Sequence, residues 1–174
     1  MSKLKILGDD MGFLSDFLGY IPAEQPPQLV SIFPPAAAQR IHCGNLPTIQ
    51  ADRIILGKGE VCHYVDVGTA VTAKTRRQTV HTGGSYHIAK GFTAHHGQSE
   101  SVPVTEPHYT KGVFYITNQR IIFTASANGF DQKLSKLTAV TPFSDAIQLQ
   151  FGRKTHTVLL PDGTTAKMVL DLLL

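Results

Sequence analysis

Five of the eight histidines in this chain fall between positions 81 and 108, and imidazole nitrogens are common ligands of zinc. His87, His95 and His96 are the first candidates, with His81 and His108 nearby. A zinc site needs three or four converging ligands, and His95 and His96 point to opposite faces if this segment is a strand. Neither a His-Glu-x-x-His nor a Cys-x-x-Cys pattern occurs. We therefore interpret these histidines as polar surface residues and expect no metal and no cofactor.

Anion binding is a second chemistry that the sequence could support. Three cations occur within four residues, at Lys74, Arg76 and Arg77. Ammonium and guanidinium groups at this spacing could form forked hydrogen bonds with phosphate oxygens. Charges along an exposed strand also discourage unwanted edge pairing, which explains the same cluster without any ligand. Both interpretations stay open: an anion- or ligand-binding site at these three residues, and a solvated strand.

Acid–base or nucleophilic catalysis would need a group such as His63, Asp66, Ser144 or Asp145. None of these residues lies in a recognised catalytic motif such as Gly-x-Ser-x-Gly. Ser144 and Asp145 are residue types that form turns between strands. Arg120 follows a predicted hairpin turn and could bond the turn's carbonyls or a neighbouring carboxylate, which is a structural role. We therefore expect no catalytic residues and no enzyme.

Short runs of β-branched and aromatic residues, separated by turn residues, predict the elements that position these groups. The clearest is Gly112-Val-Phe-Tyr-Ile-Thr-Asn-Gln-Arg-Ile-Ile-Phe123, in which a Thr-Asn-Gln-Arg turn joins the strands of a hairpin over 112–125. Gly68-Thr69 and Gly83-Gly84 are predicted to turn or break the chain, and 97–107 to form an exposed loop. The other expected strands are 59–67, 70–82, a weaker 85–95, 130–134, 138–143, 146–151 and 155–160.

Helical segments are predicted at both ends of the chain. Within residues 1–22, apolar side chains recur at spacings of three and four and share one helical face. We expect that face to dock on the body, to mediate self-association or to bind a partner protein in a groove; its partner-binding residues would be Leu14, Phe17, Leu18 and Ile21. A proline-rich linker with one short helical turn at 36–41 follows, so we divide the chain into an arm, 1–45, and a domain, 46–174.

The C-terminal segment is predicted to form a buried helix. Thr164 or Thr165 can cap its first turn. Its apolar face comprises Ala166, Val169, Leu170 and Leu173.

The order of these elements resembles that of a pleckstrin-homology-like (PH-like) or GRAM-type domain of the bacterial and phage-borne kind. The resemblance spans about residues 46–174 and rests on Gly59-Glu60, the 112–123 hairpin and Phe130-Asp-Gln-Lys-Leu-Ser-Lys-Leu137. It implies a mainly β fold, a PH-like bent β-barrel of about seven antiparallel strands capped by a C-terminal helix, here preceded by a helix and a proline-rich arm. It also implies a non-catalytic module that binds lipids, peptides or proteins.

Composition narrows the classes of partner. The net charge of +3 comes from cations that are spread thinly, so we expect no nucleic-acid partner. The N-terminus lacks a secretory signal, and no run approaches the ~18 apolar residues of a membrane span. We therefore expect a cytoplasmic protein in which Cys43 and Cys62 are reduced.

Several functions remain open at this point. We favour a non-catalytic module that binds a protein or peptide through the barrel or its N-terminal arm. The alternatives are a homo-oligomeric structural or assembly subunit of a phage or cell envelope, and a binder of anionic phosphate or lipid that uses Lys74, Arg76 and Arg77. A His-dependent metalloenzyme is the remaining alternative.

Overall fold

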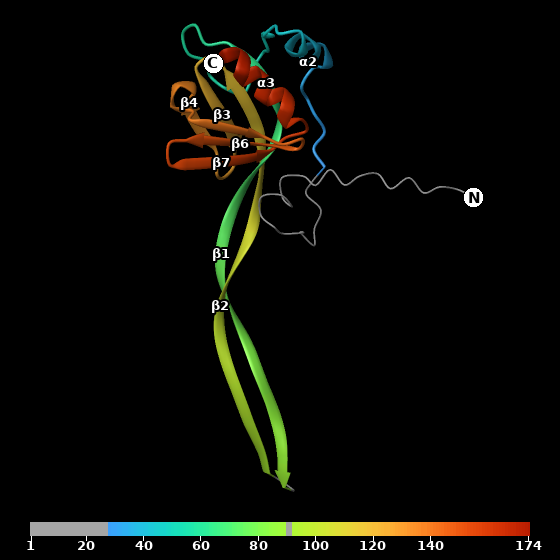
Figure 1. The fold of residues 1–174 in the computed structure, drawn as a ribbon, viewed down its shortest axis with the longest axis vertical. Helices are drawn as coiled ribbons and strands as arrows, with labels where there is room; N and C mark the ends of the chain where they lie inside the picture. The colour runs from blue at the N-terminus through green and yellow to red at the C-terminus, as the bar shows by residue number, and fades with distance from the viewer. Residues whose placement is uncertain (1–27, 90–91) are drawn as a thin grey trace, which may run out of the picture. The chain divides into compact units, whose positions relative to one another are not determined.

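The computed structural model describes residues 28–89 and 92–174, and the chain divides into two compact units. We call the first unit the body, residues 28–71 and 109–174, and the second the ribbon, residues 72–89 and 92–108. Strands β1 (Cys62–Ala89) and β2 (Phe92–Thr117) contribute residues to both units (Figure 1).

Seven antiparallel strands form one hydrogen-bonded sheet in the order β4-β3-β2-β1-β7-β6-β5. This confirms the prediction of a mainly β fold with about seven antiparallel strands. The sheet is open, however, and does not close into the expected barrel, because β4 and β5 form its two edges and each has only four residues. The shorter strands are β3 (Arg120–Ala125), β4 (Phe130–Lys133), β5 (Ala139–Pro142), β6 (Ala146–Phe151) and β7 (Lys154–Leu159).

The predicted hairpin is confirmed as the junction of β2 and β3. Its register runs from Gly112 opposite Ala125 to Ile116 opposite Ile121. The side chain of Thr117 stabilises the turn, because its hydroxyl accepts hydrogen bonds from the backbone N–H groups of Gln119 (3.2 Å) and Arg120 (2.9 Å). A threonine at this position therefore satisfies backbone donors that the short turn would otherwise leave unpaired.

Two predicted chain breaks and one predicted loop are wrong, because β1 and β2 are each much longer than expected. β1 runs without interruption through Gly68-Thr69 and Gly83-Gly84, and residues 97–107 belong to β2. Gly68 does not turn the chain. A Cβ placed there would lie 2.9 Å from the Val158 Cγ1 atom of the paired strand β7. This glycine therefore permits the close approach of a neighbouring strand.

The core of the body lies between one face of the sheet and the helices α2 (Pro35–His42) and α3 (Gly163–Leu173). α3 packs against α2, β5 and β6 (Figure 1). Its predicted apolar face is confirmed, since Ala166, Val169 and Leu170 are fully buried. From the sheet, the core takes in large side chains that include Tyr64, Phe114, Ile116, Ile121, Phe123, Ile147 and Leu149.

The cap of α3 differs from the predicted one. Asp162, rather than Thr164 or Thr165, occupies the N-cap position. Its Oδ1 atom accepts hydrogen bonds from the backbone N–H groups of Thr164 (2.9 Å) and Thr165 (3.0 Å). Both threonine hydroxyls also donate to this carboxylate, so the two threonines hold the capping residue in place.

The described part of the predicted arm, residues 28–45, belongs to the body and packs against its sheet and α3. The short helix expected at 36–41 is confirmed as α2, and Phe33 and Ile41 are buried. The ring of Phe33 lies 4.7 Å from the ring of Tyr64, measured between centroids. Asp66 accepts hydrogen bonds from the Ser31 hydroxyl (2.7 Å) and the Ile32 N–H (2.8 Å).

The predicted N-terminal helix, with Leu14, Phe17, Leu18 and Ile21, lies outside the described residues. The domain boundary near residue 46 stays a prediction.

Candidate functional site

The ribbon is the first candidate surface, because both of its faces are exposed where most of its side chains are described. Five successive residues of β1, from Ala73 to Arg77, are all exposed. Neighbouring residues in a strand point to opposite faces, so neither face is covered along this stretch. On β2 the described side chains of Ser99, Glu100, Ser101, Pro103, Thr105, Glu106 and His108 are exposed as well.

The three predicted anion-binding residues lie on this part of β1. Lys74, Arg76 and Arg77 are all exposed. Because strand residues alternate, Lys74 and Arg76 share one face, and Arg77 lies on the other. The structure therefore brings two of the three cations to one face and separates the third from them.

Two cross-strand contacts fix the register of the ribbon. The hydroxyl oxygens of Thr75 and Thr105 are 3.2 Å apart, and the Thr72 hydroxyl lies 3.4 Å from the carbonyl oxygen of His108. In an antiparallel pair with Thr75 opposite Thr105, Lys74 is opposite Glu106. Lys74 thus has a carboxylate on the neighbouring strand. By the same register, Arg76 and Arg77 are opposite Val104 and Pro103 and have none.

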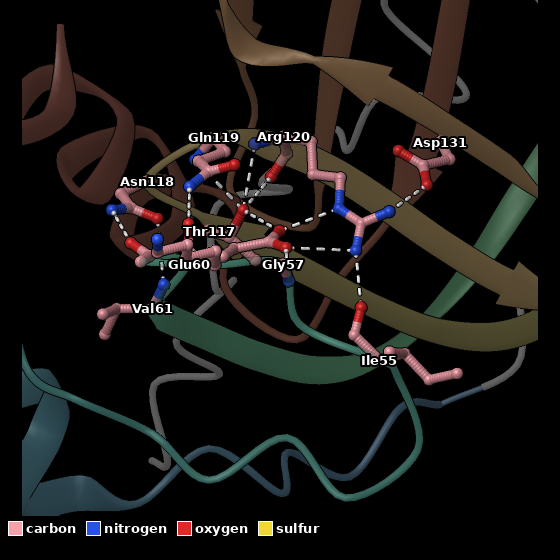
Figure 2. Close-up of polar contacts among 11 residues, drawn as sticks. Ile55, Gly57, Glu60, Val61, Thr117, Asn118, Gln119, Arg120 and Asp131 are labelled. Atoms are coloured by element: carbon pink, nitrogen blue, oxygen red, sulfur yellow. Dashed lines mark hydrogen bonds and ion pairs between the residues drawn. The ribbon is translucent and has the colours of Figure 1, made fainter.

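A partly buried ion-pair cluster lies at the hairpin turn of the body (Figure 2). We call Glu60, Thr117, Arg120 and Asp131 the Arg120 cluster. Arg120 donates to Glu60 from Nε (2.8 Å) and Nη2 (3.1 Å), and from Nη1 to Asp131 (2.5 Å). Thr117 donates to Glu60 at 2.8 Å. The structural role predicted for Arg120, with a neighbouring carboxylate as its partner, is confirmed.

Glu60 is the buried member of the Arg120 cluster, with only 7% of its surface exposed. Burial by itself raises the pKa of the Glu60 carboxyl. Hydrogen bonds from Arg120, the Gly57 N–H and Thr117 outweigh burial and hold the pKa below its usual value. The same ion pair raises the pKa of Arg120. Glu60 and Arg120 are therefore both charged near neutral pH, and their opposite charges satisfy one another.

The Arg120 cluster also anchors the loop that precedes β1. Arg120 Nη2 donates to the carbonyl oxygen of Ile55 (2.7 Å), and Glu60 accepts from the Gly57 N–H (2.6 Å). The side chain of Ile55 extends away from the cluster (Figure 2) and is 91% exposed. Leu56, the next residue, is also exposed. An anchored loop that presents two apolar side chains to solvent is a second candidate contact surface.

The residues considered for catalysis are not brought together. The Nδ1 atom of His63 forms a hydrogen bond with the carbonyl oxygen of Pro47 (2.7 Å). The carboxylate of Asp66 accepts a hydrogen bond from the Ser31 hydroxyl. Ser144 and Asp145 lie between β5 and β6, where their carbonyl oxygens accept from Gly163 and Leu160. This agrees with the turn predicted for them.

The described cysteines and histidines provide no assembled site. Cys43 and Cys62 are free thiols, and burial raises the pKa of Cys62 to about 11. No group of three metal-ligating side chains occurs among the residues that the structure describes. Of the five clustered histidines, His108 is exposed, and the side chains of the other four lie outside the described ones.

In residues 28–89 and 92–174, no helix combines the length and the apolar character that crossing a bilayer requires. Comparison with protein-family models, with curated proteins and with solved structures finds no match to this chain.

Proposed function

We propose that this chain is a non-catalytic, PH-like protein-binding module and that the ribbon is the element that engages its partner. One observation carries the proposal: both faces of the ribbon are exposed over residues 73–77 of β1 and at Ser99, Glu100, Ser101, Pro103, Thr105, Glu106 and His108 of β2. The order of seven strands and a terminal helix supports the PH-like or GRAM-type assignment.

A two-stranded ribbon buries too little apolar surface to be stable in water by itself. None of the described ribbon residues belongs to the hydrophobic core of the body. A partner that covers one face or pairs with one edge would supply the missing burial and hydrogen bonds. The free thiols Cys43 and Cys62 support a cytoplasmic location for this interaction.

Site-specific photocrosslinking in the cells that make the protein tests the proposal. A benzophenone amino acid replaces Ser101 in the ribbon, and Ser135 in the body is the matched control, because both serines are exposed. We expect a crosslinked partner protein from position 101 and none from position 135. Crosslinks from position 135 alone, or none from either position, would contradict a binding role for the ribbon.

Anionic phosphate or lipid binding is the second candidate, favoured by the exposure of Lys74, Arg76 and Arg77. Vesicles that contain phosphoinositide test it. Binding that persists when all three residues are replaced by glutamate would remove this candidate. Self-assembly into homo-oligomers, the third candidate, is tested by light scattering of the full chain, where a monomer would exclude it.

A further inference from the structure

We propose that the outer edge of β1 in the ribbon accepts an acidic, extended segment of a partner protein as an additional strand. This proposal rests on the protein-binding function proposed above and specifies the chemistry of the partner. The two edges of the ribbon differ in the direction and availability of their backbone groups and in their charges.

The cross-strand threonines show which backbone groups are free. Side chains directly opposite each other come closest in the non-hydrogen-bonded pairs of an antiparallel ladder. The 3.2 Å separation of the Thr75 and Thr105 hydroxyls is typical of such a pair. The N–H and C=O groups of Thr75 therefore point away from β2, toward the outer edge of β1, as do those of residues 73 and 77.

The outer edge of β2 is closed to strand addition. Pro103 and Pro107 lie in β2 at even spacing from Thr105, so their backbone nitrogens point outward by the same alternation. Proline has no N–H to donate, and it is tolerated in a strand where that nitrogen faces away from the partner strand. An incoming strand would miss two hydrogen bonds there. β1 contains no proline over its whole length, so its outer edge keeps its donors.

Charge then selects what can pair with β1. From Val67 to Ala89 the strand carries three cations, at residues 74, 76 and 77, and no aspartate or glutamate. Like charges that lie directly opposite each other destabilise a strand pair, whereas opposite charges stabilise it. A second copy of β1 paired across residues 74–77 would place cations against cations. An acidic strand whose carboxylates share the face of Arg76 would instead neutralise that side chain. Arg76 and Arg77 form no ion pair within the described part of the chain.

The two edges of the ribbon together exclude two kinds of partner strand and favour a third. Proline closes β2, and positive charge opposes self-pairing of β1 across the basic residues. What remains is an extended segment with carboxylates at alternating positions. Rejection of the wrong strand contributes to such specificity as much as attraction to the right one.

Binding of a synthetic peptide to the full chain, measured by fluorescence anisotropy, tests the inference. The probe is a labelled peptide of about ten residues with alternating valine and glutamate, a length typical of strands. We expect it to bind, and we expect a lysine-for-glutamate version not to bind. The double variant Arg76→Glu/Arg77→Glu should weaken binding by roughly tenfold or more, as loss of charge-assisted contacts predicts.

Two matched proline substitutions test whether the outer edge of β1 is the binding edge. Thr75→Pro removes an outward N–H from β1, whereas Thr105→Pro removes its counterpart from the edge of β2 that proline already interrupts. We expect loss of peptide binding in the first variant and retention in the second, with circular dichroism confirming that both keep their strand content. Equal binding by both variants, or by a peptide whose backbone is N-methylated at alternate residues, would overturn the proposal.

The outcomes separate this inference from the function on which it rests. A crosslinked partner from position 101 together with no binding of the acidic peptide would refute the acidic-strand proposal and leave protein binding standing. No crosslinked partner would refute both. Binding to phosphatidylserine vesicles but not to the peptide, with the same dependence on Arg76 and Arg77, would overturn the inference in favour of a lipid surface.

Discussion

The body and the ribbon share strands β1 and β2 but differ in what their side chains bury. In the body, Tyr64 and Phe114 are almost fully buried and lie in the core beneath α3. In the ribbon, the same two strands expose successive residues on both faces. A strand's stability comes from the surfaces that cover it rather than from its own hydrogen bonds. The body therefore covers its own strands, whereas the described side chains of the ribbon at residues 73–77 are left exposed on both faces.

We expect the largest difference between the body and the ribbon when one side chain is shortened and the free energy of unfolding is measured. Leu149→Ala removes a fully buried side chain from β6 and should lower the free energy of unfolding by about 3 kcal/mol. Thr105→Ala, at an exposed ribbon position, should change it by less than about 0.5 kcal/mol. Urea denaturation followed by circular dichroism measures both. Similar losses would show that the ribbon contributes to the stability of the body.

The Arg120 cluster should show the next largest effect, and it offers its own matched control. Glu60→Ala leaves Arg120 without its buried partner and should cost about 2–4 kcal/mol. Asp131→Ala removes a carboxylate whose side chain is 51% exposed and should cost less than about 1 kcal/mol. If the two variants are equally stable in urea, the buried hydrogen bonds of Glu60 do not anchor the hairpin to the loop at Ile55.

The body should also respond to pH, through His156. Its ring stacks on Phe130 with centroids 4.1 Å apart, and its buried Nε2 atom has no hydrogen-bond partner in the described structure. Burial, helped by the charge of Lys154, lowers the pKa of His156. A lowered pKa in the folded state means that the unfolded state binds the proton more readily. Stability should therefore fall as the pH drops below about 6.5.

The variant His156→Phe keeps an aromatic ring but cannot be protonated, so melting curves between about pH 7 and pH 5 should lose this decline. Glu60 acts in a different range, because its lowered pKa makes its contribution disappear only as the pH falls below about 4.3. Unchanged slopes in His156→Phe between pH 7 and pH 5 would show that this histidine does not control the pH response.

The smallest effect is expected from shortening the ribbon. Residues 73–107 are replaced by Asn-Gly, a two-residue turn suited to joining Thr72 and His108 across the ribbon. No described residue of the deleted segment belongs to the core, so the melting temperature should change by only a few degrees. A drop of more than about 10 °C would mean that the body cannot fold independently of the ribbon.

The parts of this fold that the sequence predicts well are those with local signals. The Thr117-Asn118-Gln119-Arg120 turn lies between two apolar runs, and its hairpin has the expected register. Helix α3 shows helical spacing in Ala166, Val169 and Leu170, all of which are buried. In both elements the residues that specify the structure are close together in the sequence, so the local preference agrees with the final fold.

The ribbon is predicted only in part: strands are expected at 70–82 and 85–95, but the breaks at 68–69 and 83–84 and the loop at 97–107 are wrong because their signals are ambiguous. Gly68, Gly83 and Gly84 are usual turn formers, and Pro103 and Pro107 usually end strands. Here Gly68 accommodates a neighbouring strand and the prolines lie on an outer edge, so the same residues are compatible with long strands. Exposure on both faces also removes the alternation of apolar and polar residues by which half-buried strands are recognised.

The sequence predicts that Arg120 has a carboxylate partner, but it does not identify Glu60 as that partner. Arg120 was expected to meet a carboxylate, but Glu60 lies 60 positions away in the sequence, and no local pattern joins the two. A signal did exist. Glu60 opens a predicted strand next to Gly59, where a charged residue that becomes buried needs an oppositely charged partner.

The strand order has a consequence for how this protein is made. β1 pairs with β7, so Thr69 meets Leu159 only after nearly the whole body has left the ribosome. The hairpins β2–β3 and β6–β7 join neighbouring segments and can form earlier, because closing a short loop costs little entropy. The nascent chain therefore carries β1 with one unsatisfied side until β7 emerges, and completion of the sheet is a late step in the folding of the body.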